Sequence, residues 1–328
     1  MTKSDRNKTI ELSAAELKLY KRALLKAGTA LPPDSWLNKT ICGEMETAAK
    51  ALPESFVDLL FLDPPYNLDR EFAGLKFKEL SMEEYAAMLD KWIGAVVHTL
   101  KPDASIYICG DWRSAAAIQT IAEKYFIIRN RITWQREKGR GAKANWKNSS
   151  EDIWFCTMGK DYKFNVDAVK EKRKVIAPYR IDDKPKDWEE TPDGNFRLTH
   201  PSNIWTDITV PYWSMPENTT HPTQKPEKLL AKIILASSNE GDVVFDPFLG
   251  SGTTSVAAKK LNRNYLGIEL SEDFACVAEK RLKIAEQDKR IQGYEDGVFW
   301  ERNTLKEQGN KKKTTKNKIK NDPLPGFL

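Results

Sequence analysis

The amino-acid sequence predicts an α/β fold with a mostly parallel sheet. Apolar runs of strand length alternate with longer segments whose apolar residues repeat at helical spacing. Runs without polar alternation are typical of parallel strands that helices cover on both faces. The chain has 328 residues, 40% of them hydrophobic, which is enough for one large core and a small appendage.

In the first half of the chain, the run at 57–62 predicts a buried strand. Ser81 and Glu84 have the pattern of a capping box, at the start of a helix whose apolar residues continue to Leu100. A turn is expected at 101–103, around a proline. Next we expect a strand at 105–109, a helix at 115–125, and strands at 126–133 and 151–157.

The second half begins with an irregular stretch at 161–216, where proline, charged and aromatic residues follow no period. Regular patterns then return, with helices expected at 225–237, 253–261 and 272–284, and strands at 243–245 and 264–268. Ser271 is the expected N-cap of the last helix. The renewed alternation of strand and helix predicts crossover connections in a single sheet.

The composition argues against several classes of protein. Charged residues make up 30% of the chain, the mean hydropathy is −0.58 and no apolar run reaches membrane-span length, so we expect a soluble, cytoplasmic protein. The N-terminus carries no apolar segment after its charges, so no secretory signal is expected. Four scattered cysteines and three histidines predict neither disulfides nor a metal site. A net charge of +5 is only weak support for a nucleic-acid partner.

A glycine-containing loop at 246–254 connects a predicted strand to a predicted helix. Glycines here let the backbone turn sharply and approach a ligand, and the helix N-terminus adds unpaired N–H donors. Glu269 follows the next strand, where an acidic side chain can accept hydrogen bonds from a ribose. The candidate ligand-binding residues are therefore Asp246, Phe248, Gly250, Gly252, Thr253 and Glu269.

The ligand of this loop is expected to have a ribose but no phosphate. Ser255 stands where a dinucleotide-binding loop would have its third glycine, and the lysine of a phosphate-binding loop is absent. S-adenosylmethionine fits that description. Two other interpretations of the loop stay open. It could be an ordinary strand-to-helix turn without a ligand, or it could belong to a nicotinamide-dependent oxidoreductase.

The segment Asp63-Pro64-Pro65-Tyr66 directly follows the strand at 57–62. Two prolines hold the chain extended and leave their carbonyl oxygens free to accept hydrogen bonds. The Asp63 carboxylate and the Pro64 carbonyl could hold both hydrogens of an amino group on an aromatic base, and Tyr66 could stack on that base. An oxidoreductase would not explain this segment, although a rigid turn at the end of a strand would.

At these positions the chain resembles the site-specific DNA amino-methyltransferases. The segment 63–66 resembles their catalytic tetrapeptide, and Phe248-x-Gly250-x-Gly252 resembles their cofactor loop. The resemblance covers about 36–282. The order of the motifs is that of the beta group of these enzymes, in which the catalytic segment precedes the cofactor loop. The resemblance also assigns His221, Thr223 and Lys225 to the methionine end of the cofactor, and Gly43 and Glu44, where the family has Gly-Asp, to its adenine.

The resemblance implies a Rossmann-like methyltransferase fold, permuted so that the base-binding half precedes the cofactor half. The implied division is an N-terminal helical extension at 1–35, a catalytic half at 36–160, a target-recognition insert at 161–216, a cofactor-binding half at 217–290 and a basic C-terminal tail at 291–328. Within the insert, Trp188, Arg197, His200, Trp205, Tyr212 and Trp213 could read bases, but for each of them packing is the favoured interpretation.

The function implied is methyl transfer from S-adenosylmethionine to N6 of a flipped-out adenine in double-stranded DNA. Methylation of cytosine N4 is the alternative, although a serine often replaces the aspartate there. A DNA-binding protein without activity is disfavoured because the tetrapeptide is intact. We expect no membrane partner, while a homodimer and an accompanying restriction endonuclease stay open.

The stretch at 129–150 mixes basic and aromatic residues with glycine, which suits contact with a DNA backbone. A solvated loop is the competing interpretation. The candidate DNA-binding residues are Arg136, Lys138, Arg140, Lys143, Trp146 and Lys147. Within this stretch, Asn145-Trp146-x-Asn148 followed by Glu151-Asp152 resembles a family segment that lies beside the target base.

Overall fold

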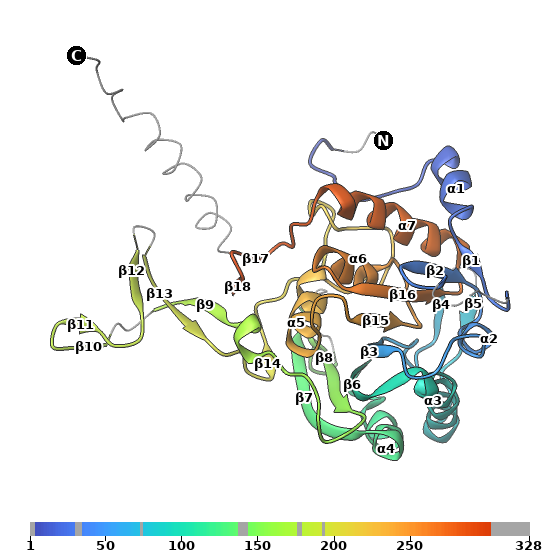
Figure 1. The fold of residues 1–328 in the computed structure, drawn as a ribbon, viewed down its shortest axis with the longest axis horizontal. Coiled ribbons are helices and arrows are strands. Elements are labelled where there is room, and N and C mark those ends of the chain that lie inside the picture. The colour runs from blue at the N-terminus through green and yellow to red at the C-terminus, as the bar shows by residue number, and fades with distance from the viewer. Residues whose placement is uncertain are drawn as a thin grey trace, which may run out of the picture.

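The computed structural model describes residues 4–29, 35–72, 75–136, 144–175, 179–191 and 194–302. Its main domain is a nine-stranded sheet with helices on both faces, in the strand order β1-β2-β16-β15-β3-β6-β8-β7-β14 (Figure 1). The strands of this sheet are β1 (Leu25–Lys26), β2 (Lys39–Cys42), β3 (Val57–Leu62), β6 (Leu100–Gly110), β7 (Ile127–Gln135), β8 (Ser150–Thr157), β14 (Ile204–Trp205), β15 (Val243–Asp246) and β16 (Asn264–Glu269). The α/β prediction is confirmed.

The helices are α1 (Ala14–Lys21), α2 (Met45–Ala49), α3 (Met82–Val96), α4 (Ala115–Tyr125), α5 (Glu227–Ser237), α6 (Thr253–Lys260) and α7 (Glu272–Gln287), with short 3₁₀ turns at η1 (Val97–Thr99) and η2 (Val166–Val169). The capping box of Ser81 and Glu84 starts α3, and the Ser271 side chain caps α7, as predicted. A separate hairpin of β4 (Arg70–Phe72) and β5 (Leu75–Phe77) follows β3.

Strand directions create one crevice in the main sheet. Across the sheet, the neighbouring strands β1, β2, β16, β15, β3 and β6 all pair in parallel. The strand β8 runs antiparallel to both of its neighbours, β6 and β7. Chain order reverses between β15 and β3, because β15 leads to β16 on one side and β3 leads to β6 on the other. In such sheets a ligand binds beyond the carboxyl ends of the strands at the point of reversal.

The central strand β3 is buried on both faces, which explains its continuous apolar run. Leu60 and Leu62 pack into the core formed with α2, α3 and α4. Leu59 and Phe61 point the other way, into the core formed with α5, α6 and α7. The prediction of a turn at 101–103 is wrong, because β6 already begins at Leu100. The pairing of β3 with β6 shifts register there, which accommodates the proline within the strand.

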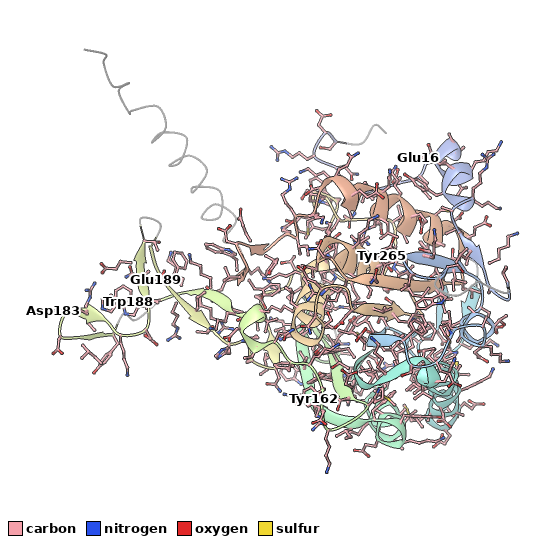
Figure 2. The ribbon with its side chains drawn as sticks, in the orientation of Figure 1. Glu16, Tyr162, Asp183, Trp188, Glu189 and Tyr265 are labelled. Carbon is pink, nitrogen blue, oxygen red and sulfur yellow. The ribbon has the colours of Figure 1, made fainter. Side chains whose placement is uncertain are left out.

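Three strands of the predicted insert and two strands from 294–300 form a second, five-stranded sheet, here called the insert sheet. Its order is β12-β13-β9-β18-β17, and a hairpin of β10 and β11 extends it. The strands are β9 (Glu171–Lys174), β10 (Arg180–Ile181), β11 (Lys184–Pro185), β12 (Glu189–Thr191), β13 (Gly194–Thr199), β17 (Tyr294–Glu295) and β18 (Val298–Trp300). It projects from the main domain as an arm, with Asp183 and Trp188 at the outer part (Figures 1 and 2).

Three segments depart from the division expected from the sequence. The strand β1 of the N-terminal extension pairs with β2, so the extension completes one edge of the main sheet. The strand β14 of the insert pairs with β7 at the other edge. Residues expected to start the basic tail instead form β17 and β18, because Phe299 is fully buried among apolar residues of α5 and η2. Trp188 and Trp205 are buried, so packing accounts for them.

A buried ionic network joins α5 to the insert sheet. Lys232 is 2% exposed, and its Nζ lies 2.5 Å from Glu171 Oε1 and 2.9 Å from Asp207 Oδ1. Lys228 Nζ lies 2.5 Å from Asp207 Oδ2 and donates a hydrogen bond to the Trp300 carbonyl oxygen. Buried charges of this kind are stable only while each has its partner. No helix in the described ranges is both long enough and apolar enough to cross a membrane.

We predict that Lys232→Met destabilises the protein by roughly 3 kcal/mol, because two buried carboxylates lose a shared cation. The control is Lys283→Met, which removes an exposed ion pair with Glu286 and should cost far less stability. Urea denaturation of the variants measures both losses. Equal losses for the two variants would contradict a network that anchors the insert sheet.

Candidate active site

A cavity of about 740 Å³ opens where β15 and β3 end, at the reversal of strand order. Residues from six separate parts of the chain line it. Of the catalytic and cofactor residues predicted from the sequence, the lining includes Gly43, Glu44, Asp63, Pro64, Pro65, Tyr66, His221, Thr223, Lys225, Asp246, Phe248, Gly250, Thr253 and Glu269. Gly252 is not part of the lining and supports the loop from behind. The two motifs of the sequence therefore face one space.

The glycine loop has the close backbone approach that its sequence predicts. Gly250 and Gly252 have φ values of +55° and +84°, which favour glycine. A Cβ on Gly250 would lie 2.9 Å from His221 Nε2, and a Cβ on Gly252 would lie 2.5 Å from the Ala278 Cβ. Both positions exclude any larger residue, so the loop packs tightly against α7 and the segment before α5.

Two acidic side chains at the ends of adjacent strands hold the loop in place. Asp246 accepts hydrogen bonds from the Phe248 N–H at 3.0 Å and the Thr254 hydroxyl at 2.5 Å. Glu269 accepts one from the Gly250 N–H at 2.7 Å and one from the Ser271 N–H at 2.8 Å. Burial raises the pKa of each carboxyl to about 7.

Arg281 is a supporting residue that the sequence did not reveal. It lies on the buried face of α7 with 2% exposure, and its guanidinium donates to the Ser251 carbonyl and the Thr253 hydroxyl, each at 2.9 Å. The same side chain pairs with Glu227 at the start of α5. An arginine in the apolar stripe of a helix is the signal that could have identified it, because such a residue needs buried partners.

His221 is held as a neutral ring at the edge of the loop. Burial, with Lys225 and Arg281 nearby, lowers its pKa to about 3. Its ring meets the Phe274 ring edge to face at 4.5 Å. Elsewhere in the cavity lining, the Gly43 N–H donates to the Glu269 carbonyl at 2.9 Å, which fixes the turn that leads to Glu44.

The Lys225 side chain contacts the catalytic segment at 63–66 rather than the glycine loop. Its Nζ is 2.7 Å from both oxygens of Asp63 and 3.3 Å from the Tyr66 hydroxyl. The Tyr66 hydroxyl also donates to Asp63 Oδ1 at 3.2 Å. Burial and the Asp63 carboxylate raise the pKa of Tyr66 well above its ordinary value, so the hydroxyl keeps its proton.

Glu151, on β8, is the second carboxylate of this group and is 4% exposed. Its Oε2 lies 3.2 Å from the Tyr66 hydroxyl and 3.3 Å from Lys225 Nζ, and its Oε1 pairs with Arg136. The sequence placed the segment around Glu151 beside the target base only through the resemblance. No local pattern indicates its contact with Tyr66, which is 85 residues away.

The family comparison decides what kind of protein has this site. The family model described as "DNA methylase" matches residues 57–280, which include both motifs and most of the main sheet. The chain belongs to this DNA methylase family.

Individual relatives of this DNA methylase match most of its length. The Type II methyltransferase M.HpaI of Haemophilus parainfluenzae is 34% identical over 249 residues, covering 74% of each chain. The DNA adenine methyltransferase YhdJ of Escherichia coli is 35% identical over 250 residues, covering 75% of this chain and 83% of the relative. The structure of the cytosine-N4-specific PvuII DNA methyltransferase superposes with a TM-score of 0.55 over 81% of this chain and 94% of the other, and at 18% identity it shows the shared fold alone.

The candidate DNA-binding residues of this methylase fall into three groups. Arg136 lies at the site, paired with Glu151. Trp146 is 94% exposed and Lys147 is exposed beside it. Lys138, Arg140 and Lys143 lie outside the described residues. Contact of these side chains with DNA stays a prediction.

We predict that Gly252→Ala destabilises the methylase by about 3 kcal/mol, from left-handed strain together with the overlap with Ala278. Gly241 provides a matched control, because its φ is also +84° but a Cβ there meets nothing within 4 Å. Gly241→Ala should therefore cost only about 1 kcal/mol. Urea denaturation compares the two variants, and similar losses would mean that the contact with α7 does not constrain the loop.

Glu269 should make the ligand-free methylase less stable as the pH rises. Its folded pKa of about 7 lies above the ordinary 4.5, so between these values the folded chain holds a proton that the unfolded chain has released. Relative to Glu269→Gln, the wild type should lose roughly 3 kcal/mol of unfolding free energy between pH 4.5 and 8. Glu286→Gln is the control, because the pKa of Glu286 is lowered to about 2 by Lys283 and Lys259, so its titration lies below this range. A constant difference between wild type and Glu269→Gln would contradict the assigned pKa.

Proposed function

We propose that this DNA methylase transfers the methyl group of S-adenosylmethionine to N6 of an adenine flipped out of duplex DNA. One observation carries the proposal: the acceptor groups of Asp63 and Pro64 face the same cavity as the glycine loop and Glu269. A site for an amino group and a site for a nucleoside-like ligand thus adjoin each other. Methyl transfer to a base requires this arrangement, because donor and acceptor must be aligned.

The residues of the cavity fit S-adenosylmethionine. Gly250 lines the cavity, Gly252 lets the loop pack against α7, and Glu269 presents a carboxylate at the end of β16, where a ribose would be bound. Glu44 would border the adenine ring, while His221 and Thr223 would lie toward the methionine end. When bound, the cofactor supplies a methyl group activated by attachment to a positively charged sulfur.

The chain's own residues would prepare the adenine amino group. The lone pair of N6 is delocalised into the ring, so the nitrogen is a poor nucleophile. Hydrogen bonds from its two N–H groups to the Asp63 carboxylate and the Pro64 carbonyl would direct the lone pair toward the methyl donor and stabilise the positive charge that develops. The proton that the methylated nitrogen then loses can pass to Asp63, and the Tyr66 ring would stack on the base.

Two observations support adenine as the target base. YhdJ, which is 35% identical to this chain, is named a DNA adenine methyltransferase. Asp63 also stands at a position where cytosine-N4 enzymes often have serine. Because a base within the duplex cannot reach the cavity, we propose that the methylase flips its target base.

The biological setting is a further part of the proposal. M.HpaI is named a Type II methyltransferase, which supports a role in restriction–modification beside an endonuclease. A homodimer and a cytoplasmic location stay predictions from the sequence. The irregular insert and the exposed Trp146 and Lys147 are the proposed contacts with double-stranded DNA.

We predict that the wild-type methylase, given methyl-labelled S-adenosylmethionine and unmethylated plasmid, places the label on adenine N6. Asp63→Ala should lower the rate about 100-fold or more, because the amino group loses a charged acceptor. The cofactor should still raise the melting temperature of Asp63→Ala. Asp161→Ala, which removes an exposed carboxylate, is the control and should retain the rate.

The labelling experiment has three outcomes that contradict the proposal. Label on cytosine would exclude adenine as the target. No label with the wild type would exclude DNA methylation under these conditions. An undiminished rate with Asp63→Ala would exclude the proposed role of its carboxylate.

A further inference from the structure

Four charged side chains meet around the Tyr66 hydroxyl, and their charges cancel. Lys225 is bound to Asp63 and also lies 3.3 Å from Glu151, to which Arg136 is bound. Lys225 and Glu151 are nearly inaccessible to water, with side-chain exposures of 7% and 4%. This group joins the catalytic carboxylate to the exposed edge of the site through direct contacts.

The neutral arrangement does not suit the proposed reaction. The target nitrogen gains a positive charge during methyl transfer, while the Lys225 ammonium already lies 2.7 Å from both Asp63 oxygens. A carboxylate oxygen has a second lone pair, so hydrogen bonding alone would not require Lys225 to leave. Charge favours its departure, because an ammonium that already neutralises Asp63 weakens the attraction of this carboxylate for the positive charge that develops on N6.

A second position for the ammonium lies close by. Glu151 Oε2 is 3.3 Å from Lys225 Nζ, and the Tyr66 hydroxyl lies 3.2 Å from both Glu151 Oε2 and Asp63 Oδ1. A rotation of the Lys225 side chain would exchange one carboxylate for the other without exposing the charge to water. Arg136 holds Glu151 in the ligand-free protein and competes with this move.

Arg136 is the most exposed member of the group. Its side chain is 32% exposed, compared with 18% for Asp63. It directly follows β7, where its N–H donates to the Ser149 carbonyl at 2.6 Å, and that carbonyl belongs to the same segment as the exposed Trp146 and Lys147. A guanidinium binds phosphate as well as carboxylate, often through two hydrogen bonds.

We propose that DNA binding draws Arg136 from Glu151 to a phosphate, so that Glu151 takes the Lys225 ammonium and Asp63 is freed for the adenine amino group. The group then carries a net charge of −1, which matches the charge that develops on N6. Glu151, Lys225 and Arg136 act through Asp63 and are positioning residues. This inference rests on the proposed function and adds that contact with DNA prepares the catalytic carboxylate.

Single-turnover methylation separates the roles of the two outer residues. The substrate is a duplex carrying the site found by sequencing the methylated plasmid. Glu151→Gln should lower the rate constant at saturating DNA about 100-fold and change the KM for DNA less than threefold. Arg136→Gln should raise the KM for DNA about tenfold and lower the rate constant less than threefold, while Arg136→Lys should restore the KM. The double variant should be as slow as Glu151→Gln alone.

An equal fall of the rate constant in Arg136→Gln and Glu151→Gln would overturn the inference. It would mean that the Arg136–Glu151 ion pair stays intact during the reaction and only supports the site. A rate constant unchanged by Glu151→Gln would also overturn the inference. The cofactor-induced rise in melting temperature checks that each variant folds. If Glu151→Gln does not fold, Glu151→Asp keeps the charge on a shorter side chain and should be about tenfold slower. Failure of the proposed function is separate, because the wild type would then place no label on adenine.

Discussion

The pairing of β15 with β3 is the constraint on which the rest of the site depends. It joins segments that are about 185 residues apart, with Val244 opposite Leu59 and Phe245 opposite Leu60. Asp58 secures the amino ends of the two strands, because its buried carboxylate accepts the Val243 N–H at 2.9 Å and is neutralised by two lysines. At the other ends, the same pairing brings the catalytic segment and the glycine loop to one cavity.

Most of the main domain could be predicted from the sequence, because its signals are local. A strand buried on both faces, a capping box and a glycine turn each occupy fewer than ten residues. The insert sheet could not be predicted, because its strands are short and pair with residues distant in the chain, as β9 does with β18. The start of β6 could not be predicted either, because its proline is tolerated within the strand only through the register shift in the pairing with β3, while the later part of β6 contains the strand predicted at 105–109.

Within the site, the sequence indicated which residues line the cavity better than it indicated what they contact. Lys225 was expected beside the cofactor, but its position on Asp63 depends on how the start of α5 faces β3, 162 residues away. Arg281 was missed for a similar reason, since its partners come from the glycine loop and from α5. Contacts between charged groups from distant segments are set by the tertiary structure and leave no periodic pattern.

The place of β18 in the insert sheet has a consequence for synthesis of the protein. The strand β9 lies near the middle of the chain, but its neighbour β18 is the last strand that the structure describes. At ordinary rates of translation, the interval between them is on the order of ten seconds. During that time the central strand of the insert sheet has one edge unpaired, while the strands of the catalytic half are already available to pair. The arm proposed to contact DNA is therefore completed after the catalytic half, and a chain truncated before β18 would leave one edge of the central strand β9 without its partner.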